Sequence, residues 1–319
     1  MSAITDRVTR AAGVEGLVKI LAERISPTDL QSLLLELFRL RASSLQPAAV
    51  LRRYEGNPSV LPSGLDPKVA VKFDQLAFEA AAQFDAIEHS PVAPLGTISA
   101  LTGLDQNVVV TTVRNTEVVS DSTNVMALEC ARRLRTGRRR GEAHGVVRLC
   151  SSHRVLRPQP LTNPAFRPHF RLFGLCTAGA TPRAWRDEAD WLIEHIAVHL
   201  ELLTKLPSIG LNPRGVMVAV TPLDDRVTEG LLEEFVFAPL KSGFPQVQFI
   251  ADGTRKQGRN YYWLACFAIK VTTPEGQEHS IVDGGFVRWM QLLLSDQKQR
   301  LLISGIGSEL TCTLLSHAR

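Results

Sequence analysis

Two adjacent tyrosines and two adjacent glycines stand at opposite ends of the stretch GRNYYWLACFAIKVTTPEGQEHSIVDGGF, which begins at residue 258. Tyr261 and Tyr262 open an apolar run typical of a strand, and Gly284 and Gly285 close the run expected to return beside it. A tyrosine at the rim of a sheet offers a ring and a hydroxyl group to a bound molecule, and glycines let that molecule approach the backbone. A simple hairpin explains the same residues, with Tyr261 in the core, Tyr262 at the surface and the glycines in a turn.

A second candidate for chemistry is the pair His195 and His199 in EHIAVH, whose spacing is that of two metal ligands on one helix face. The stretch is not HExxH, and no third ligand is evident. We therefore expect ordinary polar contacts for both histidines and no metal site. The five cysteines are widely spaced and form no CxxC pair, which favours buried thiols.

Six arginines lie close together in ARRLRTGRRRG. A polyanion such as RNA could dock on them. The alternative is a solvated helix end, where arginines suit the C-terminal dipole. The residues are Arg132, Arg133, Arg135, Arg138, Arg139 and Arg140.

The elements that must position these residues change character along the chain. Ser26, Pro27 and Asp29 predict the start of one helix, and Asp66 with Pro67 predicts the start of another. From residue 91, short β-rich runs alternate with two longer helices, which argues for a mixed, mainly antiparallel α+β domain of around six strands. The strand runs are 107–113, 146–150, 170–179, 215–222 and 261–271, and the helices are 123–134 and 185–206. We predict a helical N-terminal region over 1–90 and a core domain over 91–319, with the strand of Tyr261 near the middle of the sheet.

Composition limits the class of protein. The chain has 319 residues, of which 45% are hydrophobic and 21% charged, and its net charge of +4 is mild. No window approaches the roughly 18 uninterrupted apolar residues of a membrane span, and the N-terminus has no signal-peptide pattern. We expect a cytoplasmic protein without a membrane segment.

The order of these segments resembles the catalytic core of class II aminoacyl-tRNA synthetases and, within them, the histidyl branch, which includes the regulatory subunit of ATP phosphoribosyltransferase. In that branch a strand with a Tyr-Tyr pair leads to a Gly-Gly segment and then to a glycine-rich strand and helix, which LLISGIGSELTCTLL resembles here. The resemblance covers roughly residues 93–315. It implies an α+β, class II synthetase-like fold with a mainly antiparallel sheet flanked by helices.

The resemblance also assigns roles near the first long helix. VVSDSTNVMALECARR places Asp121 and Thr123 where the relatives hold the amino group of an amino acid. A carboxylate there would pair with an ammonium ion. An N-cap role for Asp121 or Ser122 fits the same letters.

SSHRVLRPQPLTNPAFRPHFRLFGL resembles the second class II motif, in which an arginine grips the α-phosphate of ATP. Either Arg157 or Arg154 fills that place, depending on the register. Gln159, or Leu156 in the other register, stands where the family has a glutamate. His169 and Phe173 match the returning strand.

Two further positions depart from the family. Relatives that make adenylates end the third motif with an arginine that binds the γ-phosphate, whereas here Glu309 is followed by Leu310. A neutral aliphatic side chain cannot hold a triphosphate. Gln257 occupies the place of another family arginine, although Arg259 and two more basic residues lie close by.

These two departures from the family decide the order in which we consider the possible functions. The first is a non-charging histidyl-tRNA synthetase-like paralogue that serves as a ligand-binding or regulatory partner-binding module and needs no cofactor. The alternative is an enzyme that activates the carboxylate of an amino acid with ATP and Mg, forming an acyl-adenylate. A third is RNA binding at the six arginines. Since no room remains after CTLLSHAR, we expect no anticodon-binding domain.

The resemblance finally predicts an assembly and a pocket. Class II cores pair through a helix and strand that precede the ligand site, and residues 78–98 hold that place, so we expect a homodimer. Asp121, Arg157, Tyr261 and Gly285 should line one cavity with space for an amino-acid-like ligand.

Overall fold

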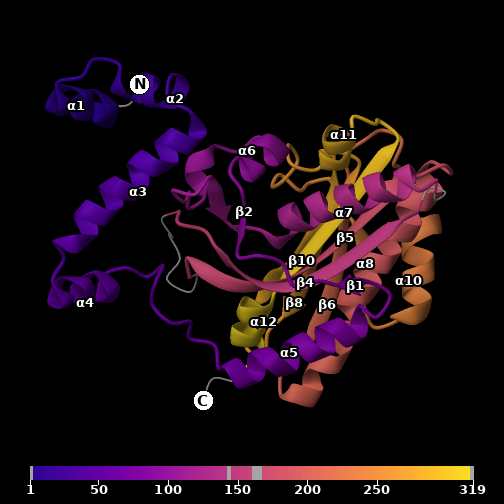
Figure 1. Cartoon of the computed structure of the whole chain (residues 1–319). Helices are drawn as coiled ribbons and strands as arrows, with labels where there is room; N and C mark the ends of the chain where they lie inside the picture. The colour runs from indigo at the N-terminus through magenta and orange to yellow at the C-terminus, as the bar shows by residue number, and fades with distance from the viewer. Residues whose placement is uncertain (1–2, 142–144, 160–166, 317–319) are drawn as a thin grey trace.

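The computed structural model describes residues 3–141, 145–159 and 167–316. The chain begins with four helices that form an arm beside the body of the molecule (Figure 1). Ser26 caps the third of them as predicted, because its Oγ accepts from the amide of Asp29 at 3.1 Å. The arm comprises α1 (Ala3–Ala12), α2 (Leu17–Glu23), α3 (Pro27–Ser43) and α4 (Pro47–Glu55).

The body is built on one sheet of eight strands in the order β1-β4-β5-β10-β9-β8-β6-β7. The six central strands are antiparallel to their neighbours, as predicted, and the two edge strands β1 and β7 add parallel pairs. The strands are β1 (Asp85–Ala86), β4 (Val147–Leu156), β5 (His169–Ala180), β6 (Gly215–Pro222), β7 (Gln248–Ala251), β8 (Ala265–Thr272), β9 (Glu278–Val287) and β10 (Gln299–Gly307). A small second sheet pairs β2 (Val92–Pro94) with β3 (Thr116–Val118).

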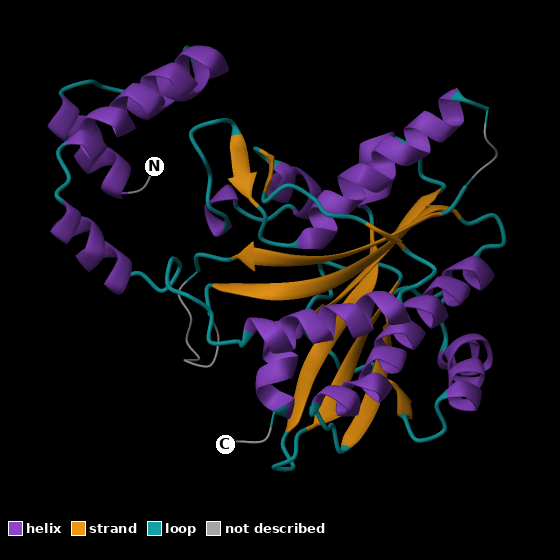
Figure 2. Ribbon diagram, turned by 60° about the horizontal axis from the view of Figure 1, so that its bottom comes forward, coloured by secondary structure: helices purple, strands orange, loops and turns teal. Residues whose placement is uncertain are grey.

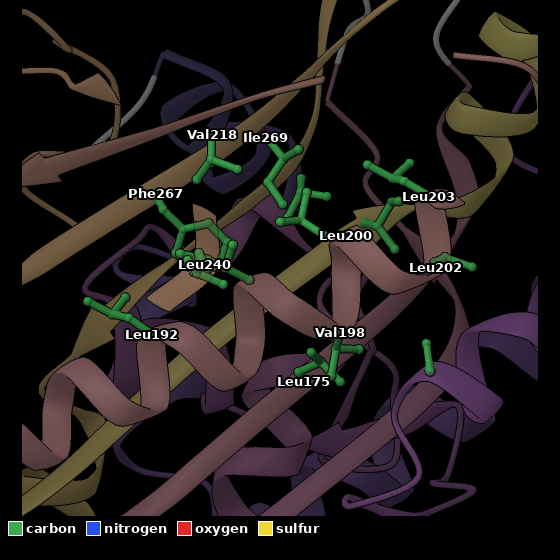
Figure 3. Close-up of a cluster of buried hydrophobic side chains, with 14 of the residues drawn as sticks. Leu175, Leu192, Val198, Leu200, Leu202, Leu203, Val218, Leu240, Phe267 and Ile269 are labelled. Atoms are coloured by element: carbon green, nitrogen blue, oxygen red, sulfur yellow. The ribbon is translucent and has the colours of Figure 1, made fainter. Parts of the chain in front are cut away.

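Helices cover both faces of the large sheet (Figure 2). The larger core lies between one face and α5 (Pro67–Ala80), α8 (Trp185–Lys205), α10 (Ala238–Gly243) and α12 (Ser308–Leu315). In Figure 3, Val198 of α8 lies beside Leu175 of β5, and Leu192 and Leu200 of α8 lie on the side of Phe267 and Ile269 of β8. The smaller core lies on the other face under α6 (Thr97–Thr102), α7 (Ser122–Arg139) and α11 (Trp289–Leu294).

Short helical turns complete the chain. They are η1 (Gln106–Val108), η2 (Leu206–Ile209), α9 (Glu229–Leu232) and the π-helix η3 (Glu233–Phe237). Within the described residues, no helix combines the length and the apolar character needed to cross a membrane.

Three details of the prediction are wrong. Tyr261 and Tyr262 do not begin a strand, because both amides donate to the carbonyl of Gly258 at 3.0 Å and close a turn before β8. Gly284 and Gly285 lie within β9 and not in a turn. The run 107–113 forms a 3-10 turn and one isolated bridge at Thr111 instead of a strand.

The boundary predicted at residue 90 stays a prediction. Its N-terminal side is not uniform, since α1 to α4 contain no buried residue whereas α5 buries Phe73 completely in the larger core. Asp66 caps α5 as predicted, with its Oδ1 accepting from the amide of Lys68 at 2.9 Å.

Candidate functional site

A cavity of about 640 Å³ lies where the N-terminus of α7 meets the ends of β4 and β5, the turn before β8, and strands β9 and β10. Several predicted site residues line it together, although they are distant in sequence. They are Asp121, Thr123, Arg157, Gln159, Tyr261 and Tyr262. The volume exceeds the needs of one amino acid and lies within the usual range of ligand clefts, about 300–1,000 Å³.

One wall of the cavity carries a carboxylate and a guanidinium side by side. Asp121 is the N-cap of α7, and its Oδ1 accepts from the amide and the hydroxyl of Thr123 at 2.9 and 2.8 Å. Arg157 donates from Nε to the carbonyl of Ser120 at 2.9 Å and from Nη2 to Asp121 Oδ2 at 3.4 Å. Its guanidinium lies 5.1 Å from the ring centre of Phe170. The two roles considered for Asp121 are therefore compatible, since one oxygen caps the helix and the other faces Arg157.

The two tyrosines also line the cavity. Their rings meet edge to face with centres 5.0 Å apart, and Tyr261 also packs edge to face on Trp289 at 5.6 Å. Burial raises the pKa of both hydroxyl groups well above the ordinary value, and the nearby carboxylates of Asp121 and Asp283 add to the effect. Both tyrosines stay neutral and can donate hydrogen bonds at physiological pH.

Asp283 and Asn124 also line the cavity and were not among the residues predicted from the sequence. Asp283 accepts from the Tyr262 hydroxyl at 2.9 Å and from Arg255 Nη2 at 2.6 Å. Asn124 is buried, and its Oδ1 has no hydrogen-bond partner among the described residues. The signal for Asp283 was its position as the one charge in the apolar run SIVDGGFV.

Neither glycine lines the cavity: Gly285 packs against Tyr262, whereas Gly284 faces Ser304 and Phe267 on the side of the larger core. A Cβ atom on Gly285 would lie 2.6 Å from Tyr262 Cδ1, and one on Gly284 would lie 2.5 Å from Ser304 Cβ and 2.8 Å from the Ile303 carbonyl oxygen. The expectation that Gly285 lines the cavity is wrong. Both glycines are required by close packing inside the sheet.

Gly284→Ala is therefore expected to lower the free energy of unfolding by roughly 1–3 kcal/mol, because the added methyl group meets backbone that cannot move aside. Gly243→Ala is the matched control, since nothing lies within 4 Å of the added atom there. Urea unfolding of both variants measures the difference. Equal stability of the two variants would contradict this account of β9.

Three predicted site residues face away from the cavity. Arg154 Nη1 lies 3.0 Å from His169 Nδ1 and 3.1 Å from Glu309 Oε2. Since arginine only donates, His169 Nδ1 accepts and its Nε2 donates to the carbonyl of Leu61 at 2.7 Å. Ser63 donates to the other oxygen of Glu309. These hydrogen bonds attach residues 61–63, which follow the arm, to the face of the sheet that α12 covers.

The pairing of β4 with β5 explains why Arg157 lines the cavity whereas Arg154 and His169 do not. Arg154 pairs with Arg171, and Leu156 with His169, so these side chains share one face of the sheet. Arg157 is three residues beyond Arg154 and reaches the other face, because side chains alternate along a strand. Between the two arginines left open by the sequence, the structure places Arg157 in the cavity.

The remaining predicted residues have structural roles. Phe173 is fully buried in the larger core, where its ring meets Phe78 edge to face at 5.3 Å. Arg259 lies outside the cavity lining and donates to the carbonyls of Gly253 and Arg255 at 3.4 and 3.2 Å. The loop between His169 and Gln159 includes 160–166, which lie outside the described residues.

The buried histidines of α8 make the polar contacts expected of them. His195 Nδ1 and His199 Nε2 each lie 2.9 Å from Ser304 Oγ, and His195 Nε2 lies 2.9 Å from Thr177 Oγ1. Burial lowers the pKa of His199 to about 3 and that of His195 well below its ordinary value. All five cysteines are free and buried, as predicted. No group of three or more metal-ligating side chains occurs in the described ranges.

The cluster of six arginines is partly neutralised by its surroundings. Glu129 pairs with Arg132 and Arg133 at 2.7 and 2.8 Å, and Asp296 pairs with Arg138 at 2.7 Å. Arg135 donates to the carbonyl of Leu293 at 3.3 Å. These contacts favour the solvated helix end over a polyanion site.

The described architecture is a class II aminoacyl-tRNA synthetase-like fold, as the sequence resemblance predicted. No family model and no curated protein matches the sequence. Solved structures do match, and the three described next share 10–14% of residues with this chain, so their similarity defines the fold alone.

Three of these structures illustrate the similarity. An ATP phosphoribosyltransferase regulatory subunit/histidyl-tRNA synthetase from Bacillus halodurans superposes with a TM-score of 0.57 at 14% identity, over 82% of this chain and 83% of that one. Apo histidyl-tRNA synthetase of S. aureus gives 0.52 at 14%, over 77% of this chain and 65% of that one. The RNA binding domain of threonyl-tRNA synthetase from Cryptosporidium parvum gives 0.54 at 10%, over 78% and 63%.

Proposed function

We propose that this chain is a non-charging paralogue of histidyl-tRNA synthetase that binds an amino-acid-like ligand in the cavity and acts as a regulatory module on a protein partner. The observation that carries the proposal is the Asp121–Arg157 pair in one cavity with the buried Tyr262 and the partly buried Tyr261. A carboxylate binds an ammonium group and a guanidinium binds a carboxylate, so the pair suits the two charges of an amino acid. The side chain of Arg157 is 43% exposed and remains accessible to a ligand.

Two observations support a regulatory role over catalysis. Leu310 stands where adenylate-forming relatives carry an arginine, and the protein from Bacillus halodurans, whose description includes a regulatory subunit, is covered over most of its length. We expect no cofactor. Cytoplasmic localisation and a homodimer formed through residues 78–98 stay predictions of the sequence.

The proposal is tested by calorimetry of the purified chain against each of the twenty standard amino acids. Arg157→Ala is expected to weaken binding of the preferred amino acid about ten- to a hundredfold, the usual effect of losing one charge-assisted hydrogen bond. Asp121→Asn should weaken it similarly while keeping an N-cap acceptor on α7. Arg154→Ala is the matched control, because Arg154 lies on the opposite face of the same strand.

Three outcomes would overturn the ligand site: no amino acid binds the folded chain, Arg154→Ala weakens binding as much as Arg157→Ala, or neither charge change has an effect. Absence of binding would leave the fold unchanged but remove the proposed role of the cavity.

The second candidate function is ATP-dependent formation of an acyl-adenylate, which would require ATP and Mg. The observation in its favour is that Arg157 lies in the cavity, where a guanidinium would stabilise charge on an α-phosphate. Amino-acid-dependent exchange of pyrophosphate into ATP tests it. Exchange that Arg157→Ala abolishes would replace the regulatory proposal with this one.

A further inference from the structure

The arm formed by α1 to α4 exposes most of its apolar side chains. None of the residues in these four helices, all of which are described, is buried. On α3, Leu33, Leu37, Phe38 and Leu40 are 46–55% exposed. Leu33, Leu37 and Phe38 follow Leu30 and Leu34 at helical spacing and form one apolar stripe along the helix.

The stripe continues beyond α3. On α4, Tyr54 follows Val50 by four residues and Leu51 by three, and the three side chains are 41–55% exposed. Figures 1 and 2 both show the arm standing beside the body and joined to α5 by an extended segment. A hydrogen bond from Asn115 to Gln31, at 3.3 Å, crosses between them without covering the apolar side chains.

Helices of this length need a packing partner. Isolated helices shorter than about 12–15 residues are marginal in water, and most helical stability in proteins comes from burying an apolar face. Three of the four helices of the arm have 10 residues or fewer. Their apolar faces must therefore be covered when the chain folds in solution.

We propose that the arm packs against the arm of a second copy of this chain. The body does not supply the missing surface, because its exposed large hydrophobic residues in the described ranges are the scattered Val71, Leu95, Leu104 and Leu292. A second arm presents the same stripe, and an isologous two-fold contact matches such a surface with itself.

The exposed apolar area of the arm and the distribution of its charged residues both agree with a second copy of this chain as the partner. About a dozen exposed large hydrophobic residues lie between Ile4 and Val60. At roughly 60 Å² each they offer on the order of 700 Å², close to the ~800 Å² that each partner contributes to a standard interface. Acidic and basic residues are interspersed along the arm, with no block of one sign that would select a nucleic acid or a strongly charged protein.

Cross-linking of the full chain tests the contact. All five native cysteines are buried, so a new surface cysteine reacts selectively with a short bismaleimide. Leu37→Cys should give at least about tenfold more covalent dimer than Leu292→Cys, which places the thiol on an equally apolar, 60% exposed site of the body. Adding Phe38→Glu should remove this excess, because both copies of the charge would enter the apolar contact.

Amide exchange gives an independent readout. Exchange across residues 30–43 should slow by about tenfold or more as the concentration of the wild-type chain rises, and Phe38→Glu should remove that dependence. Equal cross-linking of Leu37→Cys and Leu292→Cys overturns the proposal. Amide exchange across residues 30–43 that stays fast at high protein concentration also overturns the proposal, because a second copy of the chain would then not be the molecule that covers the arm.

Discussion

Acidification from pH 7 to pH 5 should lower the free energy of unfolding by about 4 kcal/mol through His195 and His199 alone. Both histidines have a folded pKa far below the ordinary histidine value of about 6.5, so only the unfolded chain binds protons over this range. Their contribution is fully present above pH 6.5 and declines as the pH falls below it. Each group then contributes a slope of about 1.4 kcal/mol per pH unit, a large part of the ~5–15 kcal/mol total stability of a protein.

Denaturant unfolding at several pH values checks this expectation. Replacing His199 by Leu should reduce the slope below pH 6 by about a third, whatever the stability of the variant at pH 7, because His153, whose pKa is lowered by burial to about 4, contributes as well. Paired carboxylates such as Glu129, whose pKa is lowered to about 2 by its hydrogen bond to Arg132, affect stability only at lower pH. A stability that is constant between pH 6.5 and pH 5 would contradict the buried, neutral state of the two histidines.

Phe173→Ala should destabilise the fold by about 3–5 kcal/mol, because the ring is fully buried and packs on Phe78. The change removes core contacts on the face of β5 opposite to the cavity. Ligand affinity of the folded fraction should therefore remain within about threefold of the wild type, well below the effect of a lost direct contact. Thermal unfolding and calorimetry on the same samples separate the two effects.

Phe170→Ala is the matched comparison on the same strand. Phe170 lines the cavity beside Arg157, so its loss should weaken ligand binding more than it lowers stability. If Phe173→Ala weakened binding more than Phe170→Ala, the placement of Phe173 on the face of β5 opposite to the cavity would be contradicted.

The sequence predicted the elements of the body well where local chemistry defines them. The predicted run 215–222 is β6 itself, and the helix predicted over 185–206 differs from α8 by one residue. Ser26 and Asp66 are caps because each side chain satisfies a backbone amide that no helical carbonyl can reach. These signals are local and need no knowledge of the remaining chain.

The site was harder to predict because it depends on which face of a strand a residue occupies. A shift of one residue moves every side chain of a strand to the other face. Arg154 and Arg157 matched the same motif in different registers, and only the pairing of β4 with β5 distinguishes them. The same alternation removes His169 and Phe173 from the cavity, whereas Asp283 belongs to it through a hydrogen bond to a residue 21 positions away.

The unequal lengths of the strands affect how the sheet can meet other molecules. Its two outermost strands have only two and four residues, whereas β4 next to β1 has ten. Short edge strands present few free backbone groups and are one means by which proteins avoid edge-to-edge aggregation. Recruitment of an extended peptide as an additional strand is therefore disfavoured at β7, whereas at the other end β1 pairs with only Leu149 and Cys150 and leaves the rest of the β4 edge without a strand partner among the described residues.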